Sequence, residues 1–386
     1  MKSNSNIDSL GIASTQRYAL RFFLLLILFL SISNGVFAQN PPRLLDQDWR
    51  TDFSRTSIDL NELSVNVPRD GIRSIDNPAF VSITEAEEWL RMREPVILVS
   101  QKGEGRAYPL QVLMWHEIVN DEFKGLPLVV TFCPLCYSAL AFERLVDGEM
   151  YEFGVSGMLR HSDLVMYDRQ THSLFQQLNG KGIVGTMTGT TLVPVAAQIV
   201  SFEEFKRAYP DGSVLSRDTG HTRRYGQNPY PGYDDIDEKP WLFRGKEDGR
   251  LPPMERVVTI EINGKAKAYP HSITREEGTI NDEHSGREIV IFHSENGAVS
   301  ALDDASIAKS RVLGSTGVFD RVVGEQLLSF RQKDGVFQDK ETGSEWDVTG
   351  LAVAGPLKGN RLHPIPHSDM FSFAWFVVWP DGTLYK

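Results

Sequence analysis

Cysteine is nearly absent from this sequence, because only Cys133 and Cys136 occur among 386 residues and both lie in the stretch TFCPLCYS. Two thiolates cannot complete the four tetrahedral positions of a structural zinc site, so a site made of cysteine alone is excluded. A c-type haem attachment site is excluded as well, because Tyr137 occupies the position of the required histidine. The two thiols need partners of another residue type, or each other.

Basic clusters are also missing. The chain has 40 Lys and Arg against 51 Asp and Glu, which gives a net charge of −11. An acidic surface without a basic patch repels nucleic acid and anionic lipid, so we expect no nucleic-acid partner. Low-complexity tracts are missing too, and the composition is that of a globular protein.

Long apolar runs are limited to one, FFLLLILFLSI at residues 22–32. Two arginines precede it, and small residues stand at the −3 and −1 positions before Gln39, which is the layout of a secretory signal peptide over residues 1–38. The run is too short for a comfortable transmembrane helix, and no cysteine follows that could carry a lipid anchor. We therefore expect cleavage after Ala38 and an extracytoplasmic protein, periplasmic or secreted, without a stable membrane span. The alternative is a chain anchored by an uncleaved signal.

The sequence repeats itself. EGRAYPLQVLMWHEIVND (104–121) aligns without a gap on KAKAYPHSITREEGTIND (265–282). Further matches follow in the same order: GVSG (154–157) with GSTG (314–317), DRQTHS (168–173) with DKETGS (339–344), and YPDGSVL (209–215) with WPDGTLY (379–385). Ordered matches of this kind indicate two copies of one structural unit.

This repeat defines the predicted domain organisation. An N-terminal extension (39–65) precedes copy one (66–216), a linker loop rich in Pro, Gly and Tyr (217–249) follows, and copy two (250–386) ends the chain. Strand patterns dominate both copies, so we predict a β-rich α+β fold in which the two modules pack with pseudo-symmetry.

Local signals predict several elements. Asn263-Gly264 between alternating apolar residues predicts a two-residue hairpin turn. Pro109 predicts the start of a short helix that runs to about Glu117. The stretch SITEAEEWLRM predicts a helix with Thr84 as its N-cap and Glu87 closing a capping box.

The two copies serve as a control for each other. After a one-residue deletion, Cys133 to Cys136 fall opposite His293 to Asn296, while Trp115 and His116 fall opposite Glu276 and Glu277. The thiols and His116 are thus specific to copy one. Because Asn296-Gly297 is typical of a hairpin turn, we expect Cys-Pro-Leu-Cys to lie in a turn between strands.

Three interpretations of the thiol pair stay open. The first is a soft-metal site for copper or zinc, completed by His116 as the third member and His161 as a weaker fourth. The second is a Cys133–Cys136 dithiol that exchanges electrons with an unidentified partner. The third is a structural disulfide in a non-catalytic binding module, although closing so short a loop contributes only about 2 kcal/mol. We take the metal site as the leading prediction.

Catalysis is left undecided by the sequence. Asp163, Asp168 and Arg169 lie in RHSDLVMYDR and, with Trp115, are candidates for a pocket beside the thiols that performs acid–base chemistry. The alternative is that both aspartates cap turns and Arg169 pairs with one of them.

Several motifs together resemble one protein family. DNPAFVS, AYPLQVLMWHEIVND, VTFCPLCYSALAF, FGVSGMLRHSDLVMYDRQTHSLF and NPYPGYDD resemble the bacterial and archaeal domain-of-unknown-function 3179 family over residues 66–386. The resemblance implies an exported protein and brings no established activity. This chain has Tyr137 where the family usually has Gly or Asn after Cys-Pro-Leu-Cys, and Phe175 where the family has Trp.

Overall fold

The computed structural model describes residues 48–386. The predicted signal peptide, residues 1–38, lies outside the described residues, as does the first part of the predicted extension. Within the described part of the chain, no helix is long and apolar enough to cross a membrane.

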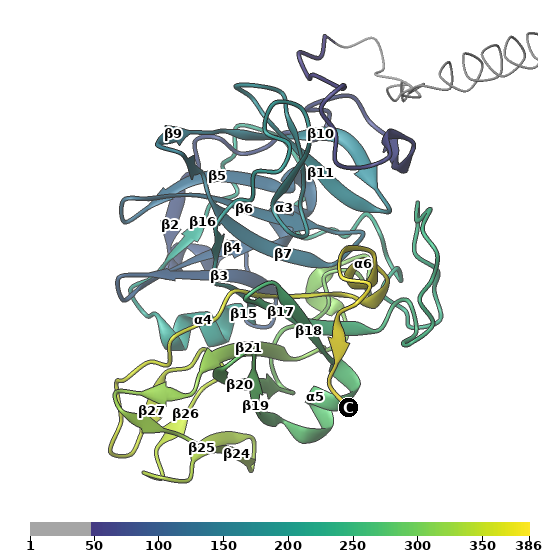
Figure 1. The fold of residues 1–386 in the computed structure, drawn as a ribbon. Coiled ribbons are helices and arrows are strands. Elements are labelled where there is room, and N and C mark those ends of the chain that lie inside the picture. The colour runs from purple at the N-terminus through teal and green to yellow at the C-terminus, as the bar shows by residue number, and fades with distance from the viewer. Residues whose placement is uncertain (1–47) are drawn as a thin grey trace, which may run out of the picture. The chain divides into compact units, whose positions relative to one another are not determined.

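Strands dominate the first half of the fold (Figure 1). One sheet has the order β15 (Ala197–Ser201), β3 (Pro95–Gln101), β4 (Glu104–Pro109), β16 (Ser213–Leu215), β2 (Phe80–Ser82). A second has the order β14 (Pro194–Val195), β7 (Ser138–Glu143), β6 (Leu126–Cys133), β5 (Ile118–Phe123). A third has the order β1 (Leu63–Val65), β10 (Phe153–Arg160), β11 (Asp163–Asp168), β12 (Leu174–Gln176), β13 (Lys181–Val184), and β8 (Leu145–Val146) pairs with β9 (Glu149–Met150).

The second half is built from similar sheets. They are β28 (His367–Phe371), β17 (Arg256–Ile262), β18 (Lys265–Pro270), β29 (Thr383–Leu384); then β19 (Thr279–His284), β20 (Arg287–Ser294), β21 (Ser315–Asp320); then β24 (Phe330–Lys333), β25 (Val336–Asp339), β26 (Glu345–Trp346), β27 (Ala352–Ala354). The small pair is β22 (Val322–Val323) with β23 (Gln326–Leu327). The β-rich part of the fold prediction is confirmed.

Helices are few and short. They are η1 (Leu60–Glu62), α2 (Ile83–Ala86), α3 (Leu110–His116), α4 (Phe202–Ala208), α5 (His271–Glu277), η2 (Ile307–Lys309) and α6 (Ser372–Val378). Pro109 precedes α3, as predicted. The predicted Thr84 cap is wrong, because Ser82 caps α2 and forms the capping box with Glu85.

Strand pairing corrects the alignment of the two halves around the cysteines. Ile118 pairs with Thr131, and Thr279 pairs with Phe292, so both positions differ by the same 161 residues. The assumed one-residue deletion is therefore wrong, and Cys133 corresponds to Ser294. The match of GVSG with GSTG is wrong as well, since GVSG lies in β10 while GSTG leads into β21, which pairs with β20 as β7 pairs with β6.

The segment after β20 also departs from expectation. Asn296-Gly297 does not close a two-residue hairpin, because β20 ends at Ser294 and β21 begins at Ser315. The apolar residues after Gly297 are buried as loop residues: Ala298, Val299, Ala301 and Leu302. Their burial thus does not require a strand.

The two halves share hydrophobic cores. The cluster that contains both cysteines also includes Val257 and Phe371 from the second half. β15 packs against β21 (Figure 1), and Gln198 on β15 donates hydrogen bonds to Thr316 O at 2.7 Å and Val348 O at 2.8 Å. The pseudo-symmetric packing of two complete modules stays a prediction.

Candidate thiol–carboxylate site

The Cys-Pro-Leu-Cys segment forms a tight turn between β6 and β7, as predicted. Cys133 ends β6 and pairs with Ser138, the first residue of β7, and Tyr137 N donates to Pro134 O at 3.2 Å. Tyr137 adopts a φ of 54°, a conformation that glycine or asparagine accepts more readily. The Tyr137 ring is packed against Phe132 and Phe371 and carries the Arg256 guanidinium over its face at 3.9 Å, contacts that offset the strain.

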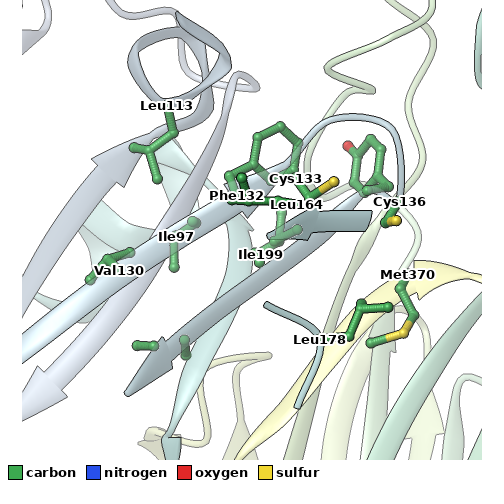
Figure 2. Close-up of a cluster of buried hydrophobic side chains, with 14 of the residues drawn as sticks. Ile97, Leu113, Val130, Phe132, Cys133, Cys136, Leu164, Leu178, Ile199 and Met370 are labelled. Atoms are coloured by element: carbon green, nitrogen blue, oxygen red, sulfur yellow. The ribbon is translucent and has the colours of Figure 1, made fainter. Parts of the chain in front are cut away.

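Both thiols are free and buried, with Cys133 2% exposed and Cys136 fully enclosed. Figure 2 shows their sulfur atoms at the two ends of the turn, with Leu164 of β11 close to Cys133. The Asp163 carboxylate joins them, and one ligating atom from each of the three residues lies within 4.8 Å of the others. Asp163, which the sequence analysis placed in a pocket beside the thiols, thus forms one cluster with Cys133 and Cys136.

The β10–β11 hairpin brings Asp163 to this place. His161 and Ser162 form its two-residue loop, and their φ values of 50° and 75° are those of a tight hairpin turn whose twist matches the strands. Asp163 is the first residue of β11 and is 1% exposed. Its Oδ2 accepts hydrogen bonds from Gln176 Nε2 and from Leu178 N, whereas its buried Oδ1 forms no hydrogen bond of regular geometry with the described residues. Asp163 does not simply cap a turn.

Burial favours the protonated forms of Asp163 and Cys136. It raises the pKa of Asp163 to about 7, although hydrogen bonds from Gln176 and Leu178 oppose the shift. Burial also raises the pKa of the Cys136 thiol, and the neighbouring Cys133 and Asp163 raise it further. Removing these protons requires a nearby positive charge or a proton acceptor.

Glu117 is a second buried carboxylate near this group, which the sequence reasoning missed. It follows α3 with φ 59° and ψ −32°, and the corresponding residue after α5 is Gly278 with φ 65° and ψ −36°. Burial, and then the charge of Asp163, raise the pKa of Glu117 to about 8. In the alignment of the two copies, Glu117 of copy one stands opposite Gly278 of copy two. This difference is the sequence signal that could have revealed Glu117.

A pocket of about 440 Å³ opens beside the thiols and is mainly apolar. Glu117 and Cys133 line it, together with Leu135 from the turn and with Tyr230 and Trp241 from the linker loop. Other walls come from residues of the β10–β11 hairpin and of the segment after β1, including Val67, Ile72, Val155, Met158, Leu159 and Leu164. The Cys133 thiol and the Glu117 carboxyl group therefore line the same apolar pocket.

A family model described as protein of unknown function (DUF3179) matches residues 69–382. The chain belongs to the DUF3179 family. Comparisons with curated proteins and with solved structures give no match, so neither supplies an activity or a fold relative. The chemistry of this DUF3179 chain has to be inferred from its own residues.

The two histidines that we predicted as metal ligands in this DUF3179 protein, His116 and His161, lie outside the cluster of Cys133, Cys136 and Asp163. The His116 ring is buried, with Nδ1 2.6 Å from Arg73 O and Nε2 2.7 Å from Tyr225 Oη, so both nitrogens have partners. Burial lowers the pKa of His116 to about 4, which keeps the ring neutral. His161 lies in the β10–β11 loop, where Nε2 is 3.5 Å from a Glu62 carboxylate oxygen and Nδ1 has no partner.

The remaining predicted pocket residues do not line the pocket beside the thiols. Asp168 caps a turn, because its carboxylate accepts hydrogen bonds from the backbone N–H groups of Thr171 and Ser173. Arg169 forms an ion pair with Asp76 at 3.0 Å. Trp115 packs against the core at the end of α3, and its indole N–H has no hydrogen-bond partner in the part of the chain that the structure describes.

Proposed function

We propose that Cys133, Cys136 and Asp163 bind one metal ion. The observation that carries this proposal is the convergence of three buried donor side chains, whose ligating atoms all lie within 4.8 Å of one another. Around a tetrahedral zinc ion, with Zn–S near 2.3 Å and Zn–O near 2.1 Å, donor atoms are separated by about 3.6–3.8 Å. The donor atoms, which lie within 4.8 Å of one another, would have to approach by at most about 1 Å to reach that spacing.

The donor set favours Zn²⁺ over Cu⁺. The sequence left both metals open because two thiolates suit either ion. The structure adds an aspartate oxygen in place of the expected imidazole. Carboxylate oxygen is a common ligand of zinc, whereas Cu⁺ prefers sulfur. Copper therefore becomes the less favoured occupant.

Three protein ligands leave one tetrahedral position for water or a ligand, as in catalytic zinc sites. Cys133 lines the pocket, so we assign the open position to the pocket side. Zinc binding requires thiolates and a carboxylate, so it must displace protons from groups whose pKa burial has raised. The affinity for zinc should therefore fall steeply as the pH is lowered.

A dithiol function is the second candidate, and one observation favours it. Cys133 reaches the pocket, while Cys136 is fully buried beside Asp163. A carboxyl group with a pKa of about 7 is suited to accept the Cys136 proton when that thiol attacks a mixed disulfide at Cys133. The electron acceptor or donor would be a thiol or disulfide of another protein that enters the pocket.

Export and an origin from two copies complete the proposal. The signal-like segment supports export. The order strand–strand–helix–strand–strand–strand recurs from β3 to β7 and from β17 to β21, apart from the short helix η2 before β21, and Glu117 and Gly278 share the same unusual backbone conformation. In this view both copies descend from one module, and only copy one gained the cysteines and Glu117.

Metal analysis of the purified protein without a tag tests the proposal. The wild type should contain about one zinc per chain, and Cys136→Ser should contain none. We expect Asp163→Asn to bind zinc about 10–100-fold more weakly, because one ligand charge is lost. His116→Ala is the matched control and should keep its zinc, since both ring nitrogens are occupied elsewhere.

Two results would redirect the assignment. A reversible Cys133–Cys136 disulfide in a protein that binds neither zinc nor copper would support the dithiol function. Loss of zinc in His116→Ala but not in Asp163→Asn would contradict the donor set proposed here.

A further inference from the structure

The Glu117 carboxyl group has an unusual position in the pocket beside the thiols. Glu117 is 9% exposed, and among the described residues its carboxyl group has neither a hydrogen-bond nor an ion-pair partner. Buried carboxylates are normally paired, because an isolated charge in an apolar setting is costly. The missing partner is expected to come from outside the protein.

Backbone strain points the same way. A φ of 59° with a ψ of −32° is strained for any residue with a Cβ, at a cost of about 1–3 kcal/mol. The equivalent turn in the second half uses glycine, Gly278. Position 117 is thus occupied by glutamate although glycine adopts the same turn without strain. Packing does not explain why the residue carries a carboxyl group.

The walls around Glu117 fit the body of an organic molecule. The pocket volume of about 440 Å³ falls in the range of roughly 300–1,000 Å³ typical of small-molecule sites. Two aromatic rings of the linker loop, Tyr230 and Trp241, line it with their centroids 6.2 Å apart at 60°. Trp241 and Leu242 are 40% and 53% exposed, so apolar surface continues to the mouth of the pocket.

We propose that this pocket binds a small organic cation, an amine with a hydrocarbon body, whose ammonium group pairs with Glu117. Apolar walls accommodate the hydrocarbon, and the Tyr230 and Trp241 rings add cation–π attraction for the ammonium group. Among the described residues none that lines the pocket is cationic, so the positive charge must be carried by the ligand. This inference goes beyond the metal proposal and does not require a bound ion.

Calorimetric titration of metal-free protein at pH 8 provides the test, with 2-phenylethylamine and its neutral analogue 2-phenylethanol as probes. We expect wild type to bind the amine at least tenfold more tightly than the alcohol. In Glu117→Gln the amine affinity should fall at least tenfold, to that of the alcohol, while binding of the alcohol is unchanged. Trp241→Ala should weaken amine binding several-fold.

The matched control is Glu122→Gln, which removes one carboxyl group from an exposed position on β5 by the same substitution. It should bind the amine like wild type. Equal affinity for amine and alcohol, unchanged amine binding in Glu117→Gln, or no binding of either probe would each overturn the inference. Zinc content is measured separately, so a zinc-free protein that prefers the amine refutes the metal proposal alone, and a zinc protein that ignores it refutes this inference alone.

Discussion

Glu117 should make the stability of the metal-free protein depend on pH in a way that Glu117→Gln abolishes. The pKa of Glu117 is raised from 4.5 to about 8 in the folded protein. Each pKa unit corresponds to about 1.4 kcal/mol. The carboxyl group therefore opposes folding by at most about 5 kcal/mol well above pH 8, by about 3 kcal/mol at pH 7 and by about 1 kcal/mol at pH 5.

The sign follows from proton binding. Below pH 4.5 Glu117 is neutral in both states and contributes no difference. Between pH 4.5 and 8 the unfolded chain loses this proton while the folded protein keeps it, so the free energy of unfolding falls as the pH rises. Glutamine has no proton to lose. The stability gained by Glu117→Gln should thus grow from pH 5 to pH 8.

Urea denaturation followed by tryptophan fluorescence, in EDTA at pH 5, 7 and 8, measures this gain. We expect Glu117→Gln to be more stable than wild type by about 1 kcal/mol at pH 5 and about 4 kcal/mol at pH 8, the latter an upper limit. The exposed variant Glu122→Gln should track wild type throughout. Parallel curves for wild type and Glu117→Gln across this range would refute the idea that Glu117 is buried without a partner.

Three further substitutions test the backbone and the packing around the site. Glu117→Gly should be more stable than Glu117→Ala by about 1–2 kcal/mol in urea denaturation, because only glycine accepts this φ without strain; equal midpoints would contradict the strain. Tyr137→Gly should lower the free energy of unfolding by about 2–3 kcal/mol, because the lost ring contacts outweigh the relieved φ; a stabilised variant would show the reverse balance. Asp121→Asn should cost more than Asp282→Asn, about 2–3 against about 1 kcal/mol by the same assay, because Asp121 is 5% and Asp282 18% exposed in otherwise similar pairs with a tyrosine and a basic residue; equal costs would count against the difference in burial.

Local signals in the sequence predicted local structure well. The turn at Asn263-Gly264 closes the β17–β18 hairpin, and the helix after Pro109 is α3. These two features depend on backbone preferences within a few residues, which composition and spacing record directly. The Cys-Pro-Leu-Cys segment is also a turn between strands, as expected, although that expectation rested on a hairpin at Asn296-Gly297 that does not form.

The partners of the thiols could not be predicted in the same way. His116 is close to the cysteines along the chain, but its ring is turned to Arg73 and to Tyr225 of the linker loop. Asp163 reaches them only because the β10–β11 hairpin folds back over the turn. Such contacts depend on sheet packing between distant segments, which no local pattern encodes.

The linker loop is packed against the candidate site. The predicted linker loop, residues 217–249, contains no helix or strand, but it is not a free connection. Instead Tyr233 is buried and donates from its hydroxyl to Leu135 O at 3.0 Å, while Ser162 donates to Trp241 O at 2.5 Å. The loop is thereby tied to both the Cys-Pro-Leu-Cys turn and the β10–β11 hairpin, and forms part of the pocket wall.

The comparison between the two halves carries the functional argument furthest. At the turn after the short helix, the second half has glycine, the residue that this backbone favours, and the first half has glutamate. That glutamate costs stability through its strained φ and through its buried, unpaired carboxyl group. At the end of β6 the second half has Ser294 where the first half has Cys133. Two positions at which the first half differs from the second thus lie in the wall of one pocket. A functional site that requires Glu117 and Cys133, at a cost in folding stability, accounts for both differences.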